Sequence, residues 1–185
     1  QRQMCIREKN RGLKMEIVLY EPEIPGNTGN IARLCAANHM TLHLIKPLGF
    51  SIDDKHVKRA GLDYWHLVDV QVHENIQELY EKYPDRRYFY ATTKAKHTHS
   101  EVKYEIGDML VFGPETRGLP ESLLDGKEDT CIRIPMVDEA RSLNLSNAVA
   151  IIAYEGMRQL DYPDLKAEGN WIPVSYTHLR AHETA

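Results

Sequence analysis

The 185-residue sequence has few cysteines, no low-complexity tract, no internal repeat and no apolar run long enough to span a membrane. Its three cysteines are an odd number without metal-ligand spacing, which argues against a disulfide-rich secreted scaffold and against a zinc finger. The basic N-terminus also lacks the apolar core of a signal peptide. We therefore expect one globular domain without a membrane segment, in a reducing, cytoplasmic setting.

Several motifs of common enzyme classes are also absent. The sequence has no Walker phosphate loop, no GxGxxG dinucleotide turn and no GxSxG nucleophile elbow. An ordinary NTPase, dehydrogenase or serine hydrolase is therefore disfavoured. His97 and His99 come nearest to a metal-ligand pair, but no third ligand follows at a recognisable spacing, so we expect no metal.

Charge is unevenly distributed along the chain. The net charge is −4, and residues 1–14, with five Lys or Arg and one Glu, contribute +4, which leaves −8 for the remainder. A nucleic-acid partner would therefore meet a local basic patch rather than the field of the whole chain. Residues 1–14 lack periodicity, and the tail 166–185 has no clear strand or helix pattern. We interpret the first as a tag or linker, the second as partly tag-derived, and 15–165 as a single domain.

From residue 15 the sequence alternates two kinds of segment. Short β-branched or aromatic runs bounded by Gly, Pro or charge predict buried strands at 16–20, 42–45, 66–70, 87–92, 109–113 and 131–135. Helical patterns are found at 27–39, 53–60, 74–83, 120–124 and 143–160. This order predicts an α/β fold with a mostly parallel sheet covered by helices on both faces. Ligands in such folds bind beyond the carboxyl ends of the strands.

The first strand exit, YEPEIPGNTGNIARLCAAN, combines residues that end a strand with residues that start a helix. Asn27, Thr28 and Asn30 are able to cap the helix, whose free amides suit an anion. Arg33 follows Asn30 by about one turn and is predicted to project from the same face toward the strand ends. A capped turn with a surface arginine is the simpler alternative.

Three later strand exits carry further polar or glycine-rich loops. ATTKAKHTHSEV contains a small basic cluster with Lys94 and Lys96, which is either solvated or in contact with RNA phosphate. FGPETRGLP has its shape restricted by two glycines and two prolines, and Gly118 is suited to a positive φ angle. SLNLSN, at 142–147, places four small polar side chains where a strand gives way to a helix, more than one cap requires.

Three of these segments together resemble motifs one, two and three of the SPOUT class of RNA methyltransferases: NTGNIARLC, FGPETRGLP and IRIPMVDEARSLNLSNAVAI. EIVLYEPEIPGNTGNIARLCAAN and GFSIDDKHVKRAGLDYW are further similar to its small TrmL (YibK) branch, and the similarity covers about residues 15–162. The resemblance implies a homodimer that binds S-adenosylmethionine in a C-terminal trefoil knot and methylates a ribose 2′-hydroxyl. For this branch the implied substrate is the wobble nucleotide of leucine tRNAs, in the anticodon loop.

The resemblance also implies roles for individual residues. The implied cofactor site consists of Ala91, Gly113, Ile134, Ser142 and Leu143. Ile134 and Leu143 would enclose the adenine ring, while Ala91, where the family often has leucine, would offer its backbone. The implied catalytic set consists of Asn30, Arg33, Glu115, Ser142 and Asn144. An arginine is effectively always protonated, so we expect Arg33 to hold a phosphate and stabilise charge on the 2′-oxygen rather than act as general base.

Contacts with RNA are expected from four basic residues: Lys46, Lys55, Lys58 and Arg59. Tyr64 and Trp65 are suited to stack on unpaired anticodon bases, although a solvated helix with core aromatics is an equal alternative. Three other functions stay open at this point. They are a related methyltransferase for another tRNA or ribosomal RNA position, a cofactor-binding RNA chaperone without turnover, and a metabolite-binding α/β domain.

Overall fold

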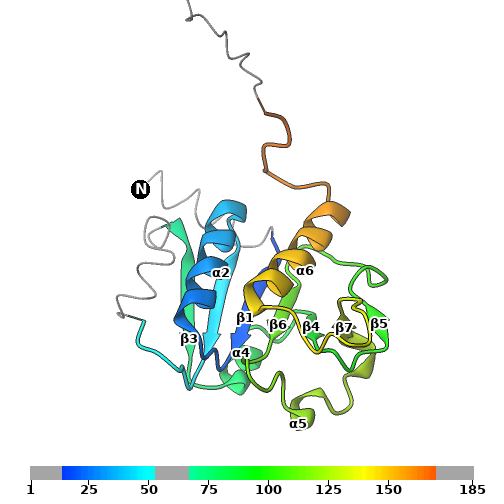
Figure 1. Cartoon of the computed structure of the whole chain (residues 1–185). Coiled ribbons are helices and arrows are strands. Elements are labelled where there is room, and N and C mark those ends of the chain that lie inside the picture. Colours follow the sequence, from blue (N-terminus) through cyan, green and yellow to red (C-terminus); the bar gives the residue numbers. More distant parts are fainter. Residues whose placement is uncertain (1–13, 53–66, 170–185) are drawn as a thin grey trace, which may run out of the picture.

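The chain forms one seven-stranded sheet, in which most of the strands are apolar runs of the sequence (Figure 1). The computed structural model describes residues 14–52 and 67–169. Within this part the strand order is β3-β2-β1-β6-β4-β7-β5, and every neighbouring pair is parallel. The strands are β1 Glu16–Tyr20, β2 Thr41–Ile45, β3 Asp69–His73, β4 Tyr88–Ala91, β5 His97–Thr98, β6 Met109–Phe112 and β7 Cys131–Arg133.

Helices cover both faces of this sheet. Helices α2 and α6 lie side by side on one face, and α4 and the short α5 lie on the other (Figure 1). Successive side chains of β1 point to opposite faces of the sheet and so enter two hydrophobic cores. Ile17 and Leu19 pack beneath α2 and α6, whereas Val18 packs with Leu79 of α4. The predicted α/β architecture is therefore confirmed. The helices are α2 Pro25–Asn38, α4 Ile76–Lys82, α5 Glu121–Leu124 and α6 Leu145–Gln159.

Two strands differ from the sequence-based expectation. β3 occupies Asp69–His73, three residues later than the predicted strand 66–70. β5 is a two-residue strand, His97–Thr98, which the sequence does not predict because its segment is polar and has no apolar run. The predicted helix 53–60 lies outside the described residues.

β7 lies between β4 and β5, although only residues 92–96 connect those two strands. Ile132 of β7 pairs with Ala91 of β4 on one side and with His97 of β5 on the other. Ala91 also pairs with Phe112 at the end of β6. The last residues of β4, β6 and β7 are therefore nearly level, and their exits meet at one edge of the sheet.

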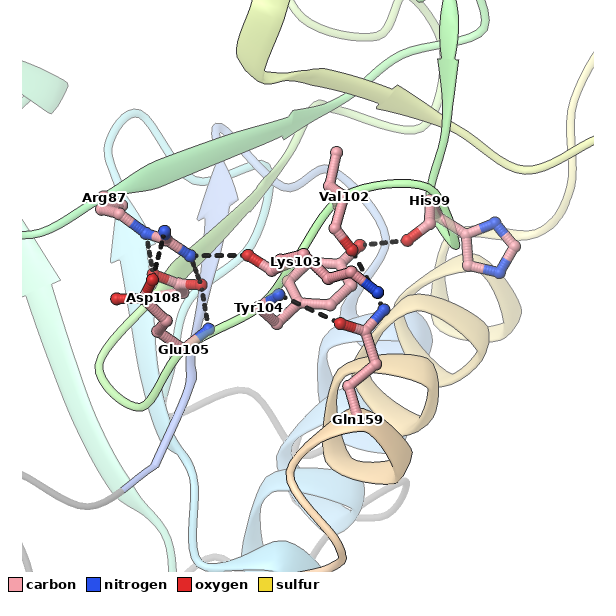
Figure 2. Close-up of polar contacts among 8 residues, drawn as sticks. All are labelled: Arg87, His99, Val102, Lys103, Tyr104, Glu105, Asp108 and Gln159. Carbon is pink, nitrogen blue, oxygen red and sulfur yellow. Dashed lines mark hydrogen bonds and ion pairs between the residues drawn. The ribbon is translucent and has the colours of Figure 1, made fainter.

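The connection from β5 to β6 is fastened by side chains (Figure 2). Gln159, at the end of α6, accepts a hydrogen bond from the backbone N–H of Tyr104 at 3.1 Å and donates one to the carbonyl oxygen of Val102 at 3.0 Å. Arg87 donates to both carboxylate oxygens of the buried Asp108 at 2.8 and 2.7 Å. These bonds satisfy polar groups of a connection that is mostly irregular.

A polar cluster is buried between the sheet and α4. The His43 ring contacts the Glu16 carboxylate (Nε2 to Oε2, 2.6 Å) and the His73 ring (Nδ1 to Nε2, 3.0 Å). His43 and His73 are almost completely buried. Burial and the neighbouring His43 lower the pKa of His73 from its usual value. Only one hydrogen can lie between the two ring nitrogens.

Candidate functional site

A cavity of about 640 Å³ opens where the exits of β4, β6 and β7 meet. The first turn of α2 and the segment that leads into α6 complete its walls. All five residues predicted to form one cofactor site line it, namely Ala91, Gly113, Ile134, Ser142 and Leu143. Glu115 and Asn144 of the predicted catalytic set line it as well. The structure therefore brings together residues that are far apart in the sequence.

The exit of β6 folds back on itself where it forms the cavity wall. A Cβ on Gly113 would lie 2.3 Å from the backbone of Gly118 and Leu119, so glycine is required at this close approach. Gly118 has a φ of +69°, in the left-handed region expected from the sequence. Its N–H donates to the carbonyl oxygen of Pro114 at 2.9 Å. The wall 113–118 is therefore a tightly folded loop.

Glu115 extends from this loop to the start of α2. Its carboxylate accepts hydrogen bonds from the backbone N–H groups of Glu23 (2.8 Å) and Ile24 (3.2 Å). It also accepts one from the side-chain amide of Asn27 at 3.1 Å. The positive end of the helix, which the sequence suggested as an anion site, is thus met by a carboxylate of the chain itself.

Asn27 links all three predicted motif segments. Its Nδ2 donates to Glu115, and its Oδ1 accepts a 3.0 Å bond from Nδ2 of Asn144. Oδ1 of Asn144 caps α6 by accepting from the backbone N–H groups of Ser146 and Asn147. Because that oxygen is engaged in the cap and an ionised Glu115 only accepts, both amides have one consistent orientation.

The expectation that Asn27, Thr28 or Asn30 caps α2 is wrong. The N-cap is Ile24, and no side chain provides a capping hydrogen bond. Asn27 is buried and makes the longer link instead. Sequence reasoning missed this role because the partners of Asn27 lie 88 and 117 residues away. No local signal marks this role, because Asn27 is one of several polar residues in the first turn of α2.

Asn30 and Arg33 lie elsewhere on α2. Both are exposed and occupy the same side of the helix, as the sequence predicts. Within the described part of the chain, neither contributes to the cavity wall. The structure therefore does not bring these two residues together with the other predicted site residues.

Four cationic side chains border the cavity: Lys94, Arg117, Arg133 and Arg141. Arg117 pairs with Glu21 and Glu23, and Lys94 pairs with Glu121. Hydrogen bonds from Thr116 lower the pKa of Glu23. The other two cations have no ion-pair partner among the residues that the structure describes. The cavity mouth is therefore cationic, but only in part available to an anion.

Only Lys46 of the four predicted RNA-binding residues lies in the described ranges, where it pairs with Glu74 at 2.6 Å. The other three fall outside those ranges, as do the two aromatic residues proposed to stack on bases: Lys55, Lys58, Arg59, Tyr64 and Trp65. In the same ranges there is no group of three or more potential metal ligands. None of the helices described there is long and apolar enough to span a bilayer.

The chain was compared with known protein families and with known proteins. The model of the SpoU rRNA Methylase family matches residues 14–154. The tRNA (cytidine(34)-2′-O)-methyltransferase of Escherichia coli (strain K12) is 54% identical over 150 residues, which are 80% of this chain and 96% of that protein. The protein of the same name from Methylovorus glucosotrophus (strain SIP3-4) is 53% identical over 148 residues, covering 80% and 96%.

Solved structures agree with this match. One described as "Structural insights into the 2-OH methylation of C/U34 on tRNA" is 44% identical, with a TM-score of 0.77 over 81% of this chain and 98% of that one. The SpoU methyltransferase AviRb from Streptomyces viridochromogenes, in complex with the cofactor AdoMet, has a TM-score of 0.74 at 21% identity, over 82% and 59% of the two chains. This second likeness shows the fold alone.

Fold and sequence together define a methyltransferase of the class that modifies RNA. The chain belongs to the SpoU methylase family, and its resemblance to the SPOUT class and to the TrmL branch is confirmed. The prediction of an enzyme agrees with the names of its relatives at 54% and 53% identity.

Proposed function

We propose that the protein is an S-adenosylmethionine-dependent tRNA methyltransferase that acts on the ribose 2′-hydroxyl of the wobble nucleotide, position 34, of leucine tRNAs. The nucleotide would be a cytidine or a modified uridine in the anticodon loop. The cavity that collects the five predicted cofactor residues is the observation that carries the proposal. The names of the relatives support position 34, whereas the restriction to leucine tRNAs comes from the resemblance to the TrmL branch.

The cavity fits the cofactor in size and in chemistry. Its volume falls within the range of roughly 300 to 1,000 Å³ that small-molecule sites occupy. Leu143 lines the cavity and is 39% exposed, so it offers apolar surface to a ring. We assign the adenine to Leu143 and Ile134, and its polar edges and the ribose to the backbone of Ala91 and Gly113 and the hydroxyl of Ser142.

The bound cofactor supplies a methyl group that its sulfonium makes electrophilic. The protein must hold the 2′-hydroxyl in line with that methyl group and stabilise the charge that develops on the oxygen. We assign the second task to Arg33, although it lies outside the cavity wall of the single described chain, so this role requires bound RNA or a second copy to bring the two together. Its guanidinium remains protonated, so it holds the adjacent phosphate and the developing negative charge instead of removing the proton.

The other members of the proposed catalytic set act from two places. Asn30 shares the exposed side of α2 with Arg33 and is assigned to the RNA. Ser142 and Asn144 lie in the segment that walls the cavity before α6. Glu115 connects that cavity to the start of α2 through Ile24 and Asn27, and the same helix carries Asn30 and Arg33. In this proposal, the exposed side of α2 contacts the RNA, the cavity at the edge of the sheet holds the cofactor, and Glu115 links the two.

A C-terminal trefoil knot is part of the proposal. The position of β7 between β4 and β5 supports it, because the connection 92–96 has to pass over β7. The segment that follows β7 then forms a wall of the cavity before α6 begins. Knots are rare in proteins, so membership in the family is the main reason to propose one here.

We also propose a homodimer formed through α6. Ile151 and Tyr154 are 40% and 44% exposed on this helix, which leaves apolar surface uncovered in a single chain. A second copy would cover it and would double the basic surface available to RNA, which partly answers the net charge of −4. Sedimentation analysis tests this, because Tyr154→Glu should shift a dimeric wild type toward the monomer.

Contacts with tRNA and the cellular location complete the proposal. We assign phosphate contacts around the anticodon loop to Lys46, Lys55, Lys58 and Arg59.

A cytoplasmic location is supported by Cys35 and Cys131, which are both buried and free of disulfides.

Transfer of label from S-adenosylmethionine tests the proposed function. The protein is incubated with total tRNA and, separately, with ribosomal RNA, and the modified nucleosides are then mapped. A 2′-O-methylated nucleotide at position 34 of leucine tRNAs is the expected product. Methylation of ribosomal RNA or of another tRNA position would reject the assignment to position 34. Cofactor binding without transfer to any RNA would favour a chaperone.

A further inference from the structure

The exits of the neighbouring strands β1 and β6, beside the cavity, are joined by two carboxylates, and each carboxylate accepts hydrogen bonds from the other exit. Glu115, on the exit of β6, accepts from the backbone N–H of Glu23 at 2.8 Å. Glu23, on the exit of β1, reaches back and accepts from the backbone N–H of Thr116 at 3.0 Å and from its hydroxyl at 2.9 Å. Because each carboxylate binds the loop that carries the other, a displacement of either loop breaks both sets of bonds.

The backbone around Glu23 is also held by residues other than those of the β6 exit. Gly49, after β2, donates its N–H to the carbonyl oxygen of Pro22 at 2.9 Å. A Cβ on Gly49 would lie 2.8 Å from both Cα and the carbonyl oxygen of Glu23, so the two backbones are in direct contact. From the cavity side, Arg117 pairs with Glu21 and Glu23. The backbone of Glu23 is therefore a fixed point to which the β6 exit is attached.

Thr116 and Arg117 belong to the cavity wall, whereas Glu23 does not line the cavity among the described residues. The two ends of this wall are held together by the close contact of Gly113 with Gly118. We propose that Glu23 is a positioning residue of the cofactor site, which holds the wall 113–118 against the start of α2. This inference rests on the proposed function, and it assigns a role to a residue outside the five implied cofactor ligands and the catalytic set.

The exposure of Glu23 separates this role from a general contribution to folding. Its side chain is 26% exposed, and the bonds that its carboxylate makes in the described structure go to Thr116 and Arg117. Loss of the carboxylate therefore opens no space in the core. Its effect should fall on cofactor affinity, through the shape of the wall, and not on the rate of the chemical step.

The test compares Glu23→Gln, Thr116→Val and the double variant with the wild type, with S-adenosylhomocysteine as the calorimetric probe. Gln keeps one acceptor oxygen, and Val keeps the shape of Thr without its hydroxyl. Glu81→Gln is the matched control, because Glu81 is an exposed carboxylate on α4 that is outside the cavity wall. The KM for S-adenosylmethionine, the kcat and the melting temperature are measured for each variant.

We expect each single variant to bind the probe about three- to tenfold more weakly, as for the loss of one hydrogen bond. The loss of affinity in the double variant should be smaller than the product of the two single losses. It should be close to the loss in the weaker-binding single variant, because both substitutions break the same contact. The KM should rise while kcat stays within about twofold of the wild type. Glu81→Gln should behave like the wild type.

Equal probe affinity in Glu23→Gln and Glu81→Gln would overturn the inference. So would fully multiplicative effects in the double variant, or a loss confined to kcat or to the melting temperature. A wild-type chain that does not bind the probe would overturn the proposed function and the inference with it. The two failures are therefore distinguishable.

Discussion

At the scale of single residues, the site depends on an amide whose role the motifs do not reveal. Asn27 accepts from Asn144 and donates to Glu115, so one side chain connects three segments. No local pattern marks it, because its partners become neighbours only when the sheet has formed. The sequence could predict that the five residues of the proposed cofactor site meet at one edge of the sheet, because the family motifs lie at strand exits, where parallel sheets place their ligands.

The first prediction concerns Asn27. In Asn27→Asp a second carboxylate faces Glu115 and cannot donate, so the affinity for S-adenosylhomocysteine should fall by about tenfold or more. Asn30→Asp on the exposed side of α2 is the matched control, and its affinity should stay within about twofold. Calorimetry measures both. Equal losses in the two variants would contradict the link through Asn27.

The second prediction concerns Arg33. Arg33→Lys keeps the positive charge and loses the planar fork of donors. If Arg33 stabilises the developing oxyanion, kcat should fall by about 100-fold or more, while tRNA affinity stays within about threefold. Rapid-quench methyl transfer and filter binding give the two numbers. A loss of tRNA affinity with an unchanged kcat would make Arg33 a binding residue only.

At the scale of elements, burial decides how well the sequence predicts the structure. β1 and β6 match their predicted ranges closely, since both are apolar runs buried by helices on both faces. β3 is displaced because its residues are largely exposed or half-buried and its pattern is weak. β5 has no apolar run, and its two polar residues become a strand only because the edge of β7 is available to them.

The third prediction concerns the end of α6, which holds the β5–β6 connection through Gln159 (Figure 2). Gln159→Leu removes the partners of the Tyr104 N–H and the Val102 carbonyl, so the free energy of unfolding should fall by about 1 to 3 kcal/mol. Urea denaturation measures this change. Gln77→Leu, an exposed amide on α4, is the control and should change stability by less than about 0.5 kcal/mol. Similar changes in both variants would contradict the assignment.

At the scale of the whole molecule, the order of the strands is the feature that the sequence predicts least. Alternating strands and helices predict a parallel sheet, but they do not predict that β7 enters between β4 and β5. That order depends on Ile132 pairing with Ala91 and His97 at the same time. These pairings place the exit of β7 beside those of β4 and β6, and so they create the cavity.

The fourth prediction is a dependence of folding on pH through His73, which is buried beside His43 and Glu16. The pKa of His73 is lowered from 6.5, first by burial and then by the neighbouring His43. As the pH falls below 6.5, the unfolded chain binds a proton at His73 more readily than the folded chain does. The free energy of unfolding should therefore fall as the pH falls.

Urea denaturation at about pH 7.5 and about pH 5.5 measures this dependence. His73→Gln removes the titrating ring, so its stability should fall less than that of the wild type over the same interval. His99→Gln, at a histidine outside the cluster, is the control and should keep the wild-type dependence. An identical pH dependence in all three proteins would exclude His73 as the cause.

The central claim, methylation of the ribose at position 34, is tested most directly with a pair of leucine tRNAs. The two RNAs are identical except that one carries 2′-deoxyribose at position 34, which removes the acceptor hydroxyl and keeps the base. With labelled S-adenosylmethionine, our account predicts methyl transfer to the ribose form and none to the deoxyribose form. Equal transfer to both RNAs would contradict it.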